Sequence, residues 1–216
     1  MVRRNFHACI KVSETDRKPS CKPVSEGFHD KINTQRPDYF AGFAVYIALG
    51  VTGATLITLI PLQAAEFAAF FEVASDNYAK DNVANGRWNA SDAQTLSREE
   101  TKRLLPGGEK TADNYLFVLR DTHLNAEVGY LWYGTLVRGT KKIAFLYQIY
   151  IHGQFRRRGY GHQAMHAFET EALKNGHNSL ALNVSAINAD ARNLYEATGY
   201  SASSLMMLKD LRRSDA

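Results

Sequence analysis

The sequence predicts a single α/β domain that begins after about residue 54. From there on, short runs rich in β-branched and aromatic residues alternate with longer segments of helical periodicity, the pattern of a sheet covered by helices. The chain has 216 residues, which is enough for one sizeable core. Its hydrophobic fraction of 45% and charged fraction of 22% are ordinary for globular proteins, and they exclude wholesale disorder, a collagen and a polytopic membrane protein.

Cysteine usage and charge narrow the class of protein further. The cysteines, Cys9 and Cys21, both lie near the N-terminus, so neither a disulfide framework nor a cysteine zinc site holds the fold. We therefore expect a cytoplasmic protein. The net charge is +4, but residues 1–38 hold eight Lys/Arg against five Asp/Glu and so carry +3 of it. The folded part is nearly neutral, and we expect no nucleic-acid partner.

The front of the chain differs from the rest in composition. Residues 1–38 contain three of the five prolines and show no periodicity, which predicts a disordered basic tail. An uncharged run follows at residues 39–65 and has two interpretations. Its length permits a membrane helix, whereas residues 55–60 (TLITLI) are typical of a strand, which would leave too few residues to span a bilayer. We favour the strand, and we therefore do not expect the protein to bind or span a membrane. Residues 39–53 are an apolar segment of uncertain role.

The elements expected in the domain, residues 54–212, follow from periodicity and from helix and strand stop signals. Apolar residues at helical spacing from Phe67 to Tyr78 predict a helix, and Pro106 ends the next one. Asn188 is the expected N-cap of the last helix, and the helix before it has an expected buried stripe of Ala164, Met165, Phe168 and Ala172. The full expected order is strand 55–60, helices 62–80 and 91–105, strands 115–120, 127–137 and 142–152, helix 161–175, strand 180–185, helix 189–198 and strand 203–208.

A basic, glycine-containing turn links the strand at 142–152 to the helix at 161–175. It reads QFRRRGYGH over residues 154–162. Backbone N–H groups at a helix start have no helical acceptor, the helix dipole adds positive potential, and glycine lets an anion approach closely. Three interpretations compete: a solvated basic turn, a dinucleotide-binding turn and a coenzyme A site.

The dinucleotide interpretation fails because the chain beyond the turn lacks two features of that fold. A dinucleotide-binding fold needs an acidic residue at the end of the next strand to bind a ribose hydroxyl. Here residues 183–185 read NVS, with no acid, and only 55 residues follow Gly161. This is too short for the remainder of such a domain.

Two motifs together resemble the GNAT superfamily of N-acetyltransferases. Arg156-x-x-Gly159-x-Gly161 matches the family's R/Q-x-x-G-x-G/A signature, and the segment from Asn188 through Tyr195 to Gly199 is similar to its N-x-x-A-x-x-L-Y-x-x-x-G-F/Y pattern. The resemblance covers roughly residues 55–211. It implies a mixed central sheet of about six to seven strands flanked by about four helices, with acetyl-coenzyme A (acetyl-CoA) in the cleft between the fourth and fifth strands.

The resemblance also implies how acetyl-CoA lies. Its pyrophosphate would bind backbone N–H groups of the turn, its pantetheine arm would pair with the end of the fourth strand, and a backbone N–H there would polarise the thioester carbonyl. The cofactor-binding residues implied are Ile149, Tyr150, Ile151, Arg156, Arg157, Arg158, Gly159, Tyr160, Gly161, His162, Asn188 and Tyr195.

Proton transfer is expected to involve Tyr195, whose phenol would stabilise or protonate the departing thiolate as a general acid. The other interpretation of Tyr195 is that it only packs. The base is less well defined: many relatives carry an acid in the middle of the fourth strand, where this chain has Gln148. A water relay, capture of neutral amine and a relay through His152 stay open.

The expected function is transfer of an acetyl group from acetyl-CoA to a primary amine of a small molecule or peptide, by direct attack in a ternary complex. The alternative is a non-catalytic acyl-CoA-binding module on the same fold. In such a fold the region from Tyr78 to Trp88 and the stretch near Tyr133 would border the amine pocket. Asp76 and Asp81 either attract the amine or form a solvated helix face. His162 and His166 have metal-compatible spacing but no obvious third ligand, so no metal is expected. The protein is expected to be a monomer or homodimer.

Overall fold

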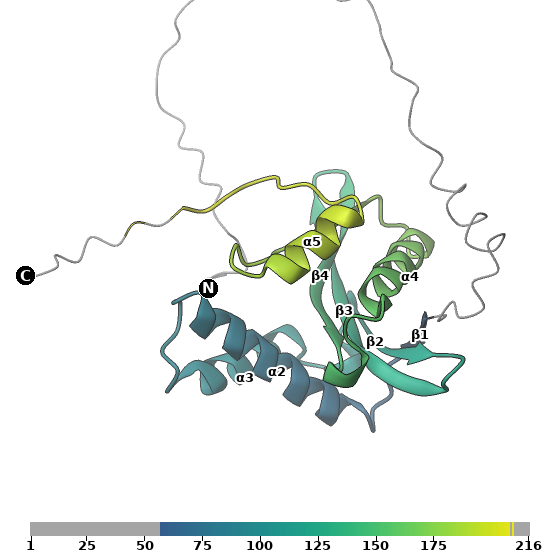
Figure 1. Cartoon of the computed structure of the whole chain (residues 1–216), viewed down its shortest axis with the longest axis horizontal. Coiled ribbons are helices and arrows are strands. Elements are labelled where there is room, and N and C mark those ends of the chain that lie inside the picture. Colours follow the sequence, from purple (N-terminus) through teal and green to yellow (C-terminus); the bar gives the residue numbers. More distant parts are fainter. Residues whose placement is uncertain (1–56, 208, 210–216) are drawn as a thin grey trace, which may run out of the picture. The chain divides into compact units, whose positions relative to one another are not determined.

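The computed structural model describes residues 57–207 and 209 (Figure 1). The described residues 57–201 belong to one compact unit, which carries all the helices and strands of the described part. The described residues of a second unit, 202–207 and 209, form neither helix nor strand. The tail predicted at 1–38 and the apolar segment predicted at 39–53 lie outside the described residues.

A mixed sheet of five strands forms the centre of the larger unit, in the order β1-β2-β3-β4-β5. Neighbouring strands are antiparallel except β4 and β5, which are parallel. The strands are β1 (Ile57–Pro61), β2 (Asn114–Asp121), β3 (Ala126–Arg138), β4 (Lys141–Ile151) and β5 (Ser179–Leu182).

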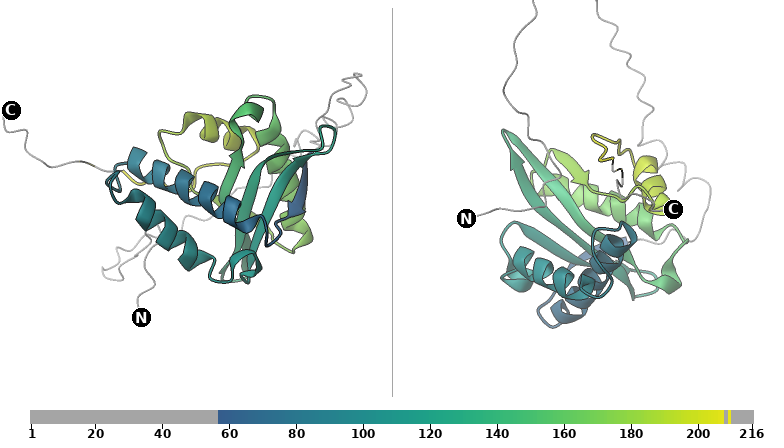
Figure 2. Two further views of the ribbon diagram at one scale, coloured as in Figure 1. Left: turned by 90° about the horizontal axis from the view of Figure 1, so that it is seen from below. Right: turned by 90° about the vertical axis from the view of Figure 1, so that its left-hand side faces the viewer.

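Helices cover both faces of this sheet (Figure 2). On one face, α2 (Phe67–Ala84) and α3 (Ala93–Leu104) come first in the chain, and Phe70 of α2 packs against Tyr130 and Trp132 of β3. The other face is covered by α4 (Tyr160–Lys174) and α5 (Ala189–Ala197). The expected apolar stripe of α4 is buried as a whole: Ala164, Met165, Phe168 and Ala172.

Most expected elements occur close to their predicted positions. The largest shift is in α2, which was expected at 62–80 and begins at Phe67. The residues expected to form its first turn are not helical, because the Leu62 N–H extends the sheet by donating to the Leu116 carbonyl. The first strand is confirmed at residues 57–60, so this part of the uncharged run at 39–65 belongs to the sheet. None of the helices in the described part of the chain is long and apolar enough to cross a membrane.

The expectation of a last strand is wrong for residues 203–207, which form no strand. The sheet of the described residues accordingly has five strands instead of six or seven. Leu205, Met206 and Met207 are exposed. A run of strand-like residues forms a strand only where the edge of a neighbouring strand pairs with it. The composition of the run does not indicate whether such an edge is present.

Candidate functional site

The parting of β4 from β5 opens the centre of the site. The two strands pair from Ile143 with Ser179 as far as Leu146 with Leu182, and there the pairing ends. β4 continues to Ile151, and over this stretch β3 is its only strand neighbour among the described residues. The fourth and fifth strands therefore separate beyond Leu146 and Leu182, as expected for a cleft between them.

A β-bulge lies at the point of parting. Trp132 of β3 pairs with Gln148 and the next residue, Tyr133, pairs with Leu146, so Tyr147 is an extra residue in β4. Bulges bend a strand and redirect its groups. Gly134 makes room for this one, because a Cβ atom there would lie 2.8 Å from the Tyr147 ring.

The register identifies which backbone groups face the opened edge. Gly129 and Ile151 are directly opposite, and the next N–H, that of His152, donates to the Val128 carbonyl at 2.9 Å. Gly129–Ile151 is thus a non-hydrogen-bonded pair, and the N–H and C=O of Ile151 point away from β3. Ile149, two residues earlier, has the same orientation. Tyr150 between them directs its backbone groups toward β3.

The glycine turn connects this open edge to α4. Gly159, the N-cap of α4, has φ of +82°, and Arg157 has φ of +61°. The left-handed conformation favours glycine at the cap, since other residues adopt it at a cost. The first hydrogen bond of the helix runs from the Gln163 N–H to the Gly159 carbonyl at 3.2 Å. The N–H groups of residues 160–162 precede it and have no acceptor within the helix.

The arginines of the turn differ in what they contact. Arg156 donates through Nε to the Ile151 carbonyl at 2.9 Å, and its guanidinium lies 5.5 Å from the centre of the Tyr150 ring. Arg157 forms an exposed ion pair of 3.0 Å with Asp190 in the first turn of α5. Arg158 is exposed. The turn is therefore positively charged and linked to both β4 and α5.

A buried carboxylate anchors the start of α4. The Tyr160 phenol donates to Asp121, the last residue of β2, at 2.6 Å, and the other Asp121 oxygen accepts from the N–H groups of His123 and Leu124. Burial alone would raise the pKa of Asp121, but these hydrogen bonds lower it below its usual range. Burial and the Asp121 carboxylate raise the pKa of Tyr160 to about 12. Sequence reasoning did not identify Asp121.

Helix α5 closes the site on the other side of the turn. Its predicted N-cap is confirmed, since Asn188 Oδ1 accepts from the Ala191 N–H at 3.1 Å. Leu194 packs against the start of α4, where a Cβ atom on Gly161 would lie 3.1 Å from its Cδ2. Tyr195 is partly buried, and burial, followed by the charge of Asp81, raises the pKa of its phenol to about 12.

The side of β4 that faces α2 and α3 carries the two residues considered for base chemistry. Gln148 shares this face with its partner Trp132, and its Nε2 atom is buried without a hydrogen-bond partner among the described residues. His152 lies 3.3 Å from the Glu127 carboxylate and packs edge-on against the rings of Tyr130 and Tyr150.

The C-terminal end of α2 reaches the segment between β5 and α5. Ser185 donates to Asn85, the C-cap of α2, at 2.5 Å. The ring of Trp88, in the loop that follows, contacts Tyr78 of α2 edge-on at 5.2 Å. The region expected to border the amine therefore lies beside the candidate cofactor site.

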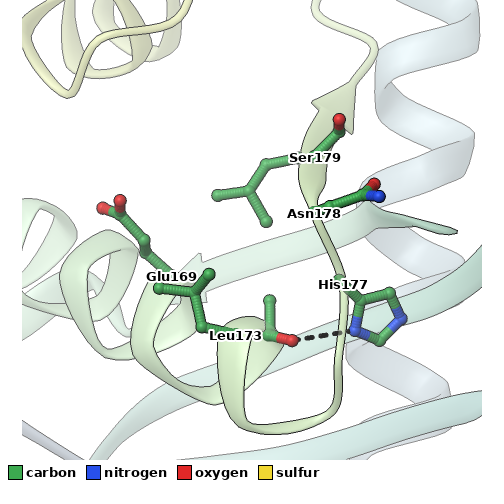
Figure 3. Close-up of a pocket in the computed structure, with 7 residues that line it drawn as sticks. Glu169, Leu173, His177, Asn178 and Ser179 are labelled. Carbon is green, nitrogen blue, oxygen red and sulfur yellow. Dashed lines mark hydrogen bonds between the residues drawn. The ribbon is translucent and has the colours of Figure 1, made fainter. Parts of the chain in front are cut away.

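A separate pocket lies at the opposite end of α4 from the glycine turn (Figure 3). Glu169, Leu173 and Ser179 are among its lining residues, and its volume is about 180 Å³. Typical ligand pockets are larger, roughly 300–1,000 Å³. Its buried His177 has both ring nitrogens engaged, by the Ala172 carbonyl at 3.0 Å and the Thr135 hydroxyl at 2.9 Å. Nothing here resembles a reactive centre.

Comparison with known proteins agrees with this arrangement. Residues 80–200, which include the bulge, the glycine turn and α5, match the model of the acetyltransferase (GNAT) family. The chain belongs to the GNAT acetyltransferase family. GNAT proteins are acyltransferases and use an acyl-CoA cosubstrate.

Two Bacillus subtilis (strain 168) proteins are similar to the same part of the chain. YycN, named an uncharacterized N-acetyltransferase, is 35% identical over 157 residues, which cover 72% of this chain and 99% of YycN. YdgE, also named an uncharacterized N-acetyltransferase, is 29% identical over 154 residues, or 71% of this chain and 98% of YdgE. The crystal structure of YycN superposes with a TM-score of 0.69 over 73% of this chain and 99% of that one, at 34% identity. The shared region thus spans nearly the whole of both relatives.

The histidine pair of α4 gains no third ligand from the fold. His162 and His166 lie on the first turns of the helix, and the described residues contain no cluster of three or more His, Cys, Asp or Glu side chains placed to hold a metal ion.

Proposed function

We propose that this protein transfers an acetyl group from acetyl-CoA to a primary amine of a small molecule or peptide, by direct attack in a ternary complex. One observation carries the proposal: β4 parts from β5 at the bulge, and its free edge leads directly into the glycine turn. An extended ligand with hydrogen-bonding amides at one end and phosphates at the other fits this sequence of features.

The residues present fit acetyl-CoA along its length. The N–H and C=O groups of Ile149 and Ile151 would pair with the pantetheine amides, as a neighbouring strand does. The N–H groups of residues 157–162 would bind the pyrophosphate, whereas that of Arg156 donates to the Gly153 carbonyl at 3.3 Å. Arg156 holds the Ile151 carbonyl in the structure, so its side chain would share that acceptor with the ligand or release it. A backbone N–H of β4 would polarise the thioester carbonyl.

Tyr195 is proposed to act on the sulfur of the departing coenzyme A. A phenol with a pKa of about 12 keeps its proton at neutral pH, so it can donate a hydrogen bond to the thiolate that forms. A free thiol has a pKa of about 8.5, well below that of this phenol. Complete transfer of the phenol proton to the thiolate is therefore unfavourable unless a second proton replaces it on the phenol oxygen. The amine nitrogen supplies that proton when the amide forms.

The second candidate function is acyl-CoA binding without catalysis. Gln148 favours it, because an amide in the middle of β4 cannot accept a proton as a carboxylate does. The retained Tyr195 favours catalysis.

Calorimetric titration of the full-length protein with acetyl-CoA, followed by a thiol-release assay, distinguishes the two. The probe amines are 1,4-diaminobutane, Nα-acetyl-lysine and a tripeptide with a free N-terminus. Binding with amine-dependent thiol release supports the acetyltransferase. Binding without release for any amine supports the binding module, and absence of binding contradicts both functions.

A further inference from the structure

One face of α2 is turned toward the segment that leads into α5. Asn85 at the end of α2 accepts from the Ser185 hydroxyl at 2.5 Å and donates through its own Nδ2 to the Asp81 carbonyl at 2.6 Å. Asp81 lies four residues before Asn85, so the two share a face of the helix. The Ser185–Asn85 hydrogen bond therefore places the face of α2 that carries Asp81 next to the segment that leads into α5. Figure 1 shows the helices α2 and α5 themselves.

The carboxylate of Asp81 is available on that face. Among the residues that the structure describes, it has no hydrogen bond and no ion pair. Asp76, one and a half turns earlier, pairs with Lys80 at 2.5 Å, and Glu72 is held by Arg98 of α3. The two aspartates therefore differ in what their charge does: that of Asp76 is neutralised within the helix, whereas that of Asp81 is free to meet a cation.

The surroundings of Asp81 suit a proton acceptor. Asp81 is exposed, and the protein around it raises the pKa of its carboxyl by partial desolvation, which the charge of Arg87 in the following loop opposes. On the α5 side the charge of Asp81 acts on the phenol of Tyr195 and raises its pKa. On the α3 side Glu100 and Arg103 act in opposite directions on the pKa of Tyr78, which lies one turn before Asp81 and is raised mainly by burial. A carboxylate with a raised pKa is a stronger base than one with an ordinary pKa.

We propose that Asp81 binds the ammonium of the acceptor and takes up its first proton, in place of the acid that β4 lacks at Gln148. The inference rests on the proposed acetyltransferase function and names its acceptor: a primary amine that arrives as a cation from the side of α2. The aromatic rings of Tyr78 and Trp88 line the same end of the helix and suit such a cation.

The proton balance of the reaction is then complete. The ammonium gives one proton to the Asp81 carboxylate, which later releases it to solvent. The neutral nitrogen forms the C–N bond with the thioester carbonyl carbon, and the C–S bond breaks with its electron pair on sulfur. The Tyr195 phenol gives its proton to that sulfur as the second proton of the nitrogen reaches the phenol oxygen and replaces it. The products are the acetamide and coenzyme A thiol.

The test compares Asp81→Asn with the matched control Asp76→Asn in the full-length protein. The readout is kcat/KM for the best of the three probe amines between about pH 7 and about pH 10, near the pKa of an alkyl ammonium. For Asp81→Asn we expect a loss of about a hundredfold at pH 7 that shrinks as the pH rises and neutral amine becomes abundant. Asp81→Glu retains most of the activity, and Asp76→Asn stays within about twofold.

A loss that is the same at every pH, or no loss, would overturn the role of Asp81. The acetyl-CoA dissociation constant of Asp81→Asn, which we expect to be unchanged, separates this role from a disturbed fold. An unmodified protein that binds acetyl-CoA but acetylates none of the amines contradicts the proposed function itself, and with it this inference.

Discussion

The phenol of Tyr160 and the buried carboxylate of Asp121 form a hydrogen bond of 2.6 Å between the first residue of α4 and the last residue of β2. Asp121 is fully buried. An ionised carboxylate in such a position is stable only when its oxygens are hydrogen-bonded, and two backbone N–H groups complete the set. The bond fixes the residue next to Gly159, and so it holds the glycine turn against the sheet.

Removing this phenol should destabilise the fold. Tyr160→Phe leaves Asp121 with backbone donors only, and we expect a loss of about 1–3 kcal/mol in the free energy of unfolding, measured in urea. The double-mutant cycle with Asp121→Asn isolates the pair. Additive effects of the two substitutions would show that the bond contributes little.

Stability should also depend on pH through Asp121. Its pKa is lowered in the folded state relative to about 3.9 in an unfolded chain, so ionised Asp121 favours the fold. This stability is present above the unfolded pKa and is lost as the pH falls through the lower folded pKa. Urea unfolding between about pH 6 and about pH 3 measures it, and Asp121→Asn should flatten this part of the curve.

A charge in the glycine turn should weaken cofactor binding. Gly159→Glu places a carboxylate where the pyrophosphate is proposed to lie, and we expect the dissociation constant of acetyl-CoA to rise at least tenfold by calorimetry. Gly176→Glu is the matched control, because Gly176 has a similar φ of +74° and equally open surroundings after the end of α4. If both variants bind equally well, the phosphates lie elsewhere.

The proposed role of Tyr195 predicts a selective loss of turnover. Tyr195→Phe should lower kcat by about a hundredfold or more and leave the acetyl-CoA dissociation constant nearly unchanged. Tyr200→Phe serves as the control: its ring lies 5.8 Å from that of Tyr195, and its buried hydroxyl has no partner among the described residues. Equal losses of kcat and affinity would indicate that Tyr195 only packs.

The bulge in β4 should depend on Gly134. In Gly134→Ala the new Cβ atom lies 2.8 Å from the Tyr147 ring, which is itself stacked on Trp132 at 4.6 Å. We expect a loss of about 1–3 kcal/mol in the free energy of unfolding together with lower turnover. Gly107→Ala, where the nearest atoms lie at an ordinary 3.5 Å, should leave both unchanged.

Elements with a strong internal pattern were predicted well. The apolar stripe of α4 and the cap at Asn188 depend on residues within a few positions of each other, and both occur as expected. The run at 203–208 has an equally good strand composition, yet residues 203–207 form no strand. A strand requires a partner edge, and that edge is not encoded within the run.

The sequence by itself determined the family, the class of cosubstrate and the position of the glycine turn, because these depend on contiguous motifs whose conformations are set by local sterics and helix capping. Tertiary structure alone decided three things: the bulge where β4 leaves β5, the Asp121 anchor beneath Tyr160, and the hydrogen bond that joins the end of α2 to the segment before α5. Each depends on strand register or on packing between residues distant in the chain, which no local pattern of residues specifies.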